Sequence, residues 1–137
     1  MTSAPIEVSD WLDAKSFSPR MTATLGLPPA DALALVSGAL TAQGFKVKDV
    51  TTTGFRASWS DLTGWLGVAM ATDWDFRRTR LAVTASPSGA DTTLTIAVEK
   101  GGEHRPGRRK GREALTAAFQ DAQRRGVRVT TTPWQKP

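Results

Sequence analysis

The chain has 137 residues, the size of one domain, and its 39% hydrophobic and 23% charged residues are typical of a folded globular protein. It has no cysteine, which excludes disulfides, thiolate nucleophiles and metal sites built from cysteine. The net charge of +5 is unevenly distributed, because residues 1–99 carry 8 basic and 10 acidic side chains whereas residues 100–137 carry 10 basic and 3 acidic ones. The basic C-terminal quarter favours anionic partners such as nucleic acid, phosphorylated ligands or an acidic surface.

The organisation predicted along the chain is an arm, one domain and a tail. Residues 1–19 have no sustained periodicity, so we expect a flexible N-terminal arm, followed by a single α+β domain at 20–126 and a C-terminal tail at 127–137. The arm lacks a basic segment followed by an apolar run, and so does not resemble a signal peptide. The longest apolar-leaning run, 64–72, is much shorter than the ~20 residues of a membrane-spanning helix. We therefore expect a cytoplasmic protein that is not transmembrane.

The first half of the domain predicts a strand, a helix and a hairpin. Residues 20–27 alternate apolar and polar side chains, as in a strand with one buried face. After Pro28-Pro29 the apolar residues follow helical spacing as far as Gly44, whose place after the last periodic residue predicts the end of the helix. Two further alternating runs, 45–50 and 55–59, predict an antiparallel hairpin.

The second half predicts another hairpin and a final helix. Segment 60–76 is ambiguous, because a polar start suits a short helix whereas Leu66, Val68 and Met70 alternate as in a strand; we favour a short helix or an irregular crossover. Residues 77–85 and 92–98 alternate on either side of a turn-rich stretch and predict a hairpin. Residues 112–125 then carry apolar side chains at helical spacing, with Gly126 as the stop.

These elements predict an α+β two-layer sandwich, in which an antiparallel sheet carries two helices on one face. The order is β-α-β-β-(short helix or crossover)-β-β-α. Amphipathic helices must bury their apolar stripes, and one face of an antiparallel sheet offers the place to do so. The order is similar to that of TBP-like and helix-grip sandwiches, a similarity of topology that by itself implies no function.

A basic segment, 99–112, joins the last predicted strand to the last helix. Its candidate anion-binding residues are Arg105, Arg108, Arg109, Lys110 and Arg112. With Gly111 as the predicted N-cap, these cations crowd the positive end of the helix dipole, which is unfavourable by ~0.3–1 kcal/mol for each exposed charge. A phosphate, carboxylate or sulfate there would meet free backbone N–H groups and several guanidinium groups. The alternative is a solvated basic loop with no ligand.

The same segment resembles a nucleotide-binding P-loop only in the spacing of two glycines. Gly102 and Gly107 are five positions apart, but Arg108 and Arg109 stand where a P-loop needs lysine and a hydroxyl residue. The sheet predicted before the helix is antiparallel rather than parallel. We therefore exclude this motif.

Residues that could support catalysis are few. His104 is the only histidine, and with no cysteine and no serine-histidine-aspartate arrangement a nucleophilic triad is unsupported. Asp73 and Asp75 form an isolated pair of carboxylates, which is a very weak metal signal. We expect no enzyme activity, no metal and no cofactor.

Tryptophans surround the ambiguous segment and predict an apolar site. The candidates for an apolar pocket or docking patch are Trp59, Trp65, Leu66, Met70 and Trp74. In a helix-grip fold, the space between sheet and helix can open into a cavity that such side chains would line, although they could equally fill the core. The sequence thus predicts a non-enzymatic binding domain for an apolar ligand or a protein partner; the alternative is a binder of nucleic acid or another polyanion through the basic segment.

Overall fold

The computed structural model describes residues 4–11, 18–60, 78–100 and 105–136. These residues form six strands and two helices. In chain order they are β1 (Arg20–Leu25), α1 (Pro29–Ala42), β2 (Lys46–Lys48), β3 (Gly54–Ser60), β4 (Arg78–Ser88), β5 (Asp91–Lys100), α3 (Arg105–Arg124) and β6 (Val129–Thr131).

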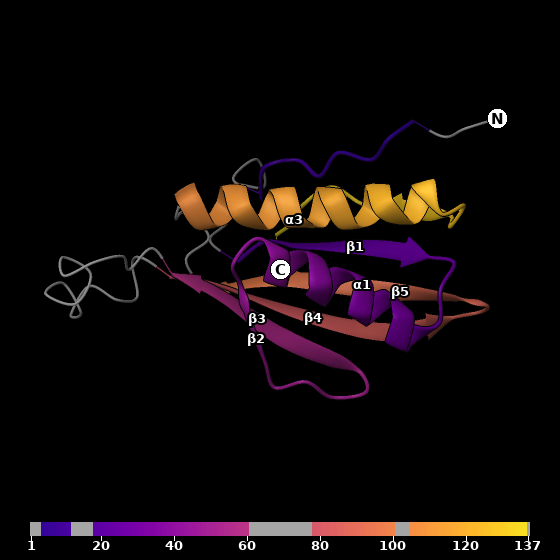
Figure 1. The fold of residues 1–137 in the computed structure, drawn as a ribbon, viewed down its shortest axis with the longest axis horizontal. Helices are drawn as coiled ribbons and strands as arrows, with labels where there is room; N and C mark the ends of the chain where they lie inside the picture. The colour runs from indigo at the N-terminus through magenta and orange to yellow at the C-terminus, as the bar shows by residue number, and fades with distance from the viewer. Residues whose placement is uncertain (1–3, 12–17, 61–77, 101–104, 137) are drawn as a thin grey trace, which may run out of the picture.

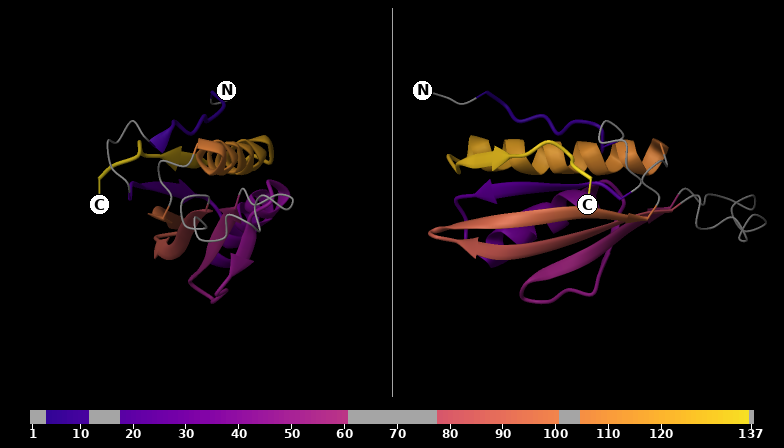
Figure 2. Two further views of the ribbon diagram at one scale, coloured as in Figure 1. Left: turned by 90° about the vertical axis from the view of Figure 1, so that its left-hand side faces the viewer. Right: turned by 180° about the vertical axis from the view of Figure 1, so that it is seen from behind.

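The strands form one antiparallel sheet in the order β2-β3-β4-β5-β1-β6. Helix α1 packs against the sheet, and α3 lies beside α1 and contacts β4 and β6. Figures 1 and 2 show both helices on the same side of the sheet. The predicted α+β architecture of a two-layer sandwich is therefore confirmed. The other face of the sheet is not covered by either helix, and we call it the open face.

Alternation along the strands separates the core from the open face. In β5, Leu94, Ile96 and Val98 are buried, whereas the residues between them are partly exposed. Helix α3 adds Leu115 and Phe119, which are fully buried between the helices and the sheet. These side chains dominate the stability of the domain, because burying one such apolar side chain contributes ~1.5–3 kcal/mol.

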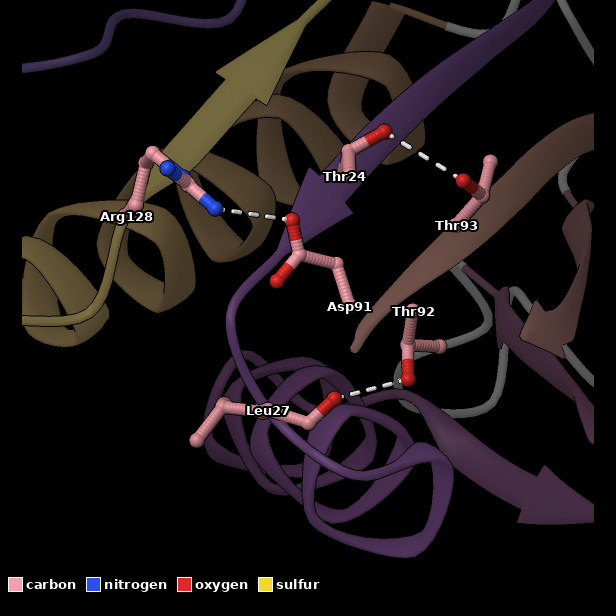
Figure 3. Close-up of polar contacts among 6 residues, drawn as sticks. All are labelled: Thr24, Leu27, Asp91, Thr92, Thr93 and Arg128. Carbon is pink, nitrogen blue, oxygen red and sulfur yellow. Dashed lines mark hydrogen bonds and ion pairs between the residues drawn. The ribbon is translucent and has the colours of Figure 1, made fainter. Parts of the chain in front are cut away.

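A polar cluster closes the end of the sheet where β1 turns into α1 (Figure 3). The hydroxyl of Thr92, which is fully buried, donates a hydrogen bond of 2.7 Å to the carbonyl oxygen of Leu27. Arg128 donates from Nη2 to Asp91 over 3.1 Å. These contacts join the start of β5 to the turn before α1 and to the residues that lead into β6.

Both ends of the described chain pack into the domain. Trp11 is fully buried and meets Trp134 edge to face, with ring centroids 5.2 Å apart at an angle of 75°. The indole N–H of Trp134 donates to the carbonyl oxygen of Ser9 over 2.8 Å. Segment 127–137, predicted as a tail, contains β6, which pairs with β1.

Helix α3 begins earlier than the sequence predicts. Its first residue is Arg105 rather than Arg112, so most of the predicted basic loop is helix. Pro106 suits this start, because its fixed φ and missing N–H are tolerated in the first turn of a helix. Residues 99 and 100 belong to β5, and residues 101–104 lie outside the described part of the chain.

Gly111, predicted as the N-cap of the last helix, lies inside α3 instead, where it allows close packing against another residue. Gly111 is buried inside α3, and a Cβ atom added to it would lie 3.0 Å from Cη2 and 3.2 Å from Cζ3 of Trp11. A glycine inside a helix costs ~1 kcal/mol relative to alanine, so its presence needs a packing reason. The ring of Trp11 provides that reason, since only glycine leaves room for it against the helix.

Candidate functional site

Three arginines form an exposed row at the start of α3. Arg105, Arg109 and Arg112 are spaced i, i+4 and i+7, which places them on one face of the helix. All three are exposed. We call them the arginine stripe. With a rise of 1.5 Å per residue, the stripe extends roughly 10 Å along the helix axis.

A shallow pocket of about 160 Å³ lies beside the stripe. Its lining residues are Asp10, Arg105, Arg108, Arg109 and Arg112. The side chain of Arg108 is only 13% exposed, and its Nε lies 2.8 Å from Oδ1 and 3.0 Å from Oδ2 of Asp10. Arg108 therefore attaches the N-terminal segment to α3, whereas the three stripe residues face solvent.

The charges of the stripe are only partly balanced, by Glu7 and Glu113, which line a neighbouring recess together with Arg112. The first turn of α3 contains no acidic residue, so the guanidinium group of Arg105 meets the positive end of the helix dipole without a compensating charge in that turn. Arg105 and Arg109 are also a like-charge i, i+4 pair, which destabilises a helix by ~0.2–0.5 kcal/mol. Within the described residues, the stripe arginines make no ion pair. An anion bound there would reduce both the unfavourable interaction with the helix dipole and the repulsion between Arg105 and Arg109.

The structure brings together most of the predicted anion-binding residues. Four of them, Arg105, Arg108, Arg109 and Arg112, line the pocket, whereas Lys110 is partly buried and does not. Sequence reasoning missed Asp10, because a carboxylate 98 positions away gives no local signal of its pairing with Arg108.

The predicted apolar site falls mainly on residues outside the described ranges. Trp65, Leu66, Met70 and Trp74 lie there, as do His104 and the Asp73 and Asp75 pair. Trp59 is described: it is partly buried, in register with Thr79 of β4, and its indole lies against Gly44, where an added Cβ would be 3.2 Å from Nε1. An apolar site in this region stays a prediction.

A second surface feature, not predicted from the sequence, is a groove of about 630 Å³ between α1 and α3. Seven of its lining residues are apolar or small and four are charged: Leu27, Ala34, Leu35, Gly38, Ala39, Ala117 and Ala118, and Asp31, Asp121, Arg124 and Arg125. Helix α1 carries one charged residue, Asp31, so its outer side is unusually apolar for a helix at a surface. The sequence contains one sign of this surface, because a helix of fourteen residues with a single charge has few polar side chains to cover its outer side.

Two other kinds of feature are absent from the part of the chain that the structure describes. No group of three histidine, aspartate or glutamate side chains lies close enough to hold a metal ion. Neither α1 nor α3 has the length and apolar character needed to cross a membrane.

Comparison with known proteins does not assign the chain to a family. No protein-family model matches the chain, and no curated protein sequence matches it. The function must therefore be argued from the arginine stripe and the surfaces around it.

Proposed function

We propose that the protein binds a polyanion, such as nucleic acid, through the arginine stripe. The observation that supports this is the alignment of three exposed arginine side chains along the N-terminal half of α3, none of which forms an ion pair with another described residue. Arginine is suited to phosphate, because its planar guanidinium can donate two parallel hydrogen bonds. A row of roughly 10 Å can contact more than one phosphate along a backbone.

Binding through the stripe predicts a strong dependence on salt. Fluorescence anisotropy with a labelled duplex of about 20 base pairs measures the affinity at several salt concentrations, and each phosphate contact contributes about −0.9 to the slope of log K against log salt. Replacing Arg105, Arg109 and Arg112 together by glutamine is expected to reduce the magnitude of this slope by about 2 to 3. A labelled single-stranded RNA of the same length extends the test to the second kind of nucleic acid.

A matched control separates the stripe from net charge. Arg124, Arg125 and Arg128 lie at the other end of α3 and just beyond it, and each pairs with Asp121 or Asp91. Their triple glutamine variant loses the same formal charge and is expected to keep a slope close to that of the wild type. Equal slopes for the two triple variants, or no binding by the wild type at low salt, would contradict the proposal.

Docking of a protein partner is the second candidate function. The observation that favours it is the α1–α3 groove, in which apolar and small residues of α1 lie at the surface beside charged residues of α3. Apolar surface of this kind is more often found at interaction sites than on the free surface of a monomer. The groove differs in position from the tryptophan-bracketed site predicted from the sequence.

A second copy of the chain is the simplest occupant to test. Sedimentation velocity over a range of concentrations measures self-association, and Gly38→Arg is expected to abolish it. Gly38 suits this design, because a Cβ atom added there meets nothing within 4 Å and the arginine can block the groove without straining the helix. A monomer at every concentration would exclude self-docking, and dimers that persist in Gly38→Arg would place the contact elsewhere.

A further inference from the structure

A second basic site lies on the open face of the sheet, away from the arginine stripe. Strands β2, β3 and β4 are adjacent in the sheet. Their register places Lys46 beside Ser58 and Ser58 beside Arg80, so these three residues form one row across the strands. Lys48 lies beside Arg56 in the next row.

These residues surround a recess of about 230 Å³, which we call the sheet pocket. Its lining also includes Ala57 and Asp49. The recess has room for roughly seven water molecules at ~30 Å³ each, so a phosphate group fits without movement of the sheet. Three adjacent strands supply its walls, which makes the positions of its side chains more fixed than those of a loop.

The sheet pocket carries an excess of positive charge. Four of its lining residues are basic, Lys46, Lys48, Arg56 and Arg80, and Asp49 is its one carboxylate. Lys48 stands directly opposite Arg56, and like charges on opposite cross-strand positions are destabilising. Within the described residues, Lys46, Lys48 and Arg80 make no ion pair.

Carboxylates hold the one arginine of β3 in place. Nε of Arg56 lies 3.2 Å from Oε1 of Glu99, and its Nη1 lies 3.7 Å from Oδ2 of Asp49. Asp49 lies just after β2 with a φ of 53°, a left-handed conformation that aspartate adopts more readily than most residues and that is common in turns. These two contacts orient the guanidinium beside the pocket from both sides.

We propose that the sheet pocket binds the phosphate group of a small phosphorylated ligand. The lysine and arginine side chains supply charge-assisted donors, and the hydroxyl of Ser58 supplies a neutral one between Lys46 and Arg80. The described positions of the open face carry no aromatic side chain, so bases of a nucleic acid would find no stacking platform there. This chemistry suits a compact phosphate ester rather than a strand, and the proposal does not depend on the arginine stripe.

The test is a titration of the isotopically labelled full-length chain followed by two-dimensional amide NMR. Inorganic phosphate and O-phosphoserine are added at constant ionic strength, with sodium chloride as the reference. Saturable shifts are expected at the amides of β2, of residues 56–58 and of Arg80, with half-saturation on the order of 1 mM or below. Stronger binding of the ester than of free phosphate would identify the ligand as an ester.

Two variants assign the binding to one site. Lys46→Gln combined with Arg80→Gln is expected to weaken binding at least about 10-fold while leaving the other amide signals unchanged. The triple glutamine variant of the arginine stripe is expected to bind phosphate like the wild type. Loss of binding in the stripe variant alone would overturn this inference while supporting the polyanion site, and non-saturating shifts equal to those with chloride would overturn it outright.

Discussion

Replacing Trp11 by alanine is expected to lower the free energy of unfolding by ~3–5 kcal/mol, the usual cost of removing a large buried aromatic side chain. Trp11 is fully buried, packs edge to face against Trp134 and rests on Gly111 of α3. Domains of this kind are stable by only ~5–15 kcal/mol, so the loss is a large share of the total. Urea unfolding followed by far-UV circular dichroism measures it.

A double-mutant cycle tests whether the cost arises from this contact. Gly111→Leu alone is expected to destabilise the protein, because its side chain would occupy the volume of the Trp11 ring. In the Trp11→Ala background the same leucine fills the vacated space and improves helix propensity. The two changes together should therefore cost less than their sum, by ~1–3 kcal/mol. Strictly additive costs would show that Trp11 and Gly111 do not share this contact.

Gly54→Ala is expected to cost ~3 kcal/mol, at the upper end of the range for overpacking a well-packed site. A Cβ atom at this position would lie 2.5 Å from the carbonyl oxygen of Val83 and 3.3 Å from Cα of Thr84. Both are backbone atoms of β4, so relief of the clash must separate β3 from β4. The hydrogen bond of 2.7 Å from the Ala85 N–H of β4 to the carbonyl oxygen of Thr53 opposes that movement.

Gly38→Ala is the control, because it is expected to raise the free energy of unfolding whereas Gly54→Ala lowers it. Gly38 lies inside α1, where an added Cβ meets nothing within 4 Å, so alanine is expected to stabilise the helix by ~0.5–1 kcal/mol. If the two variants have equal m values in urea unfolding, their midpoints compare their stabilities directly. A Gly54→Ala protein as stable as the wild type would mean that β3 and β4 are not paired in this register.

Local patterns in the sequence predicted most of the described elements. Alternation of apolar residues identified β1, β4 and β5, and helical spacing identified α1. Gly44 and Gly126 follow the helices with φ values of 96° and 81°, in agreement with their predicted role at the helix ends. These features could be predicted because the conformation of a strand or of a helix end is determined largely by residues that are close together in the sequence.

Features that depend on distant residues could not be predicted. The neighbours of Gly111 along the chain predict a helix cap. Its packing partner, Trp11, is 100 positions away, so the sequence around Gly111 does not reveal the contact. The polar positions of β2, β3 and β4 were each recognisable, but their meeting around one pocket depends on the register between strands. For the same reason, the pairing of Arg108 with Asp10 could not be predicted.

The place of β1 between two strands from the second half of the chain has a consequence for folding. β1 lies between β5 and β6, and Thr22 bonds to Thr132 across 110 positions, while Trp134 and Ser9 meet across 125. Neither edge of β1 has its partner until the second half of the chain has left the ribosome. Proteins dominated by such distant contacts fold slowly, because loop closure precedes the energetic gain. The domain therefore completes its fold only once β6 has left the ribosome and can pair with β1.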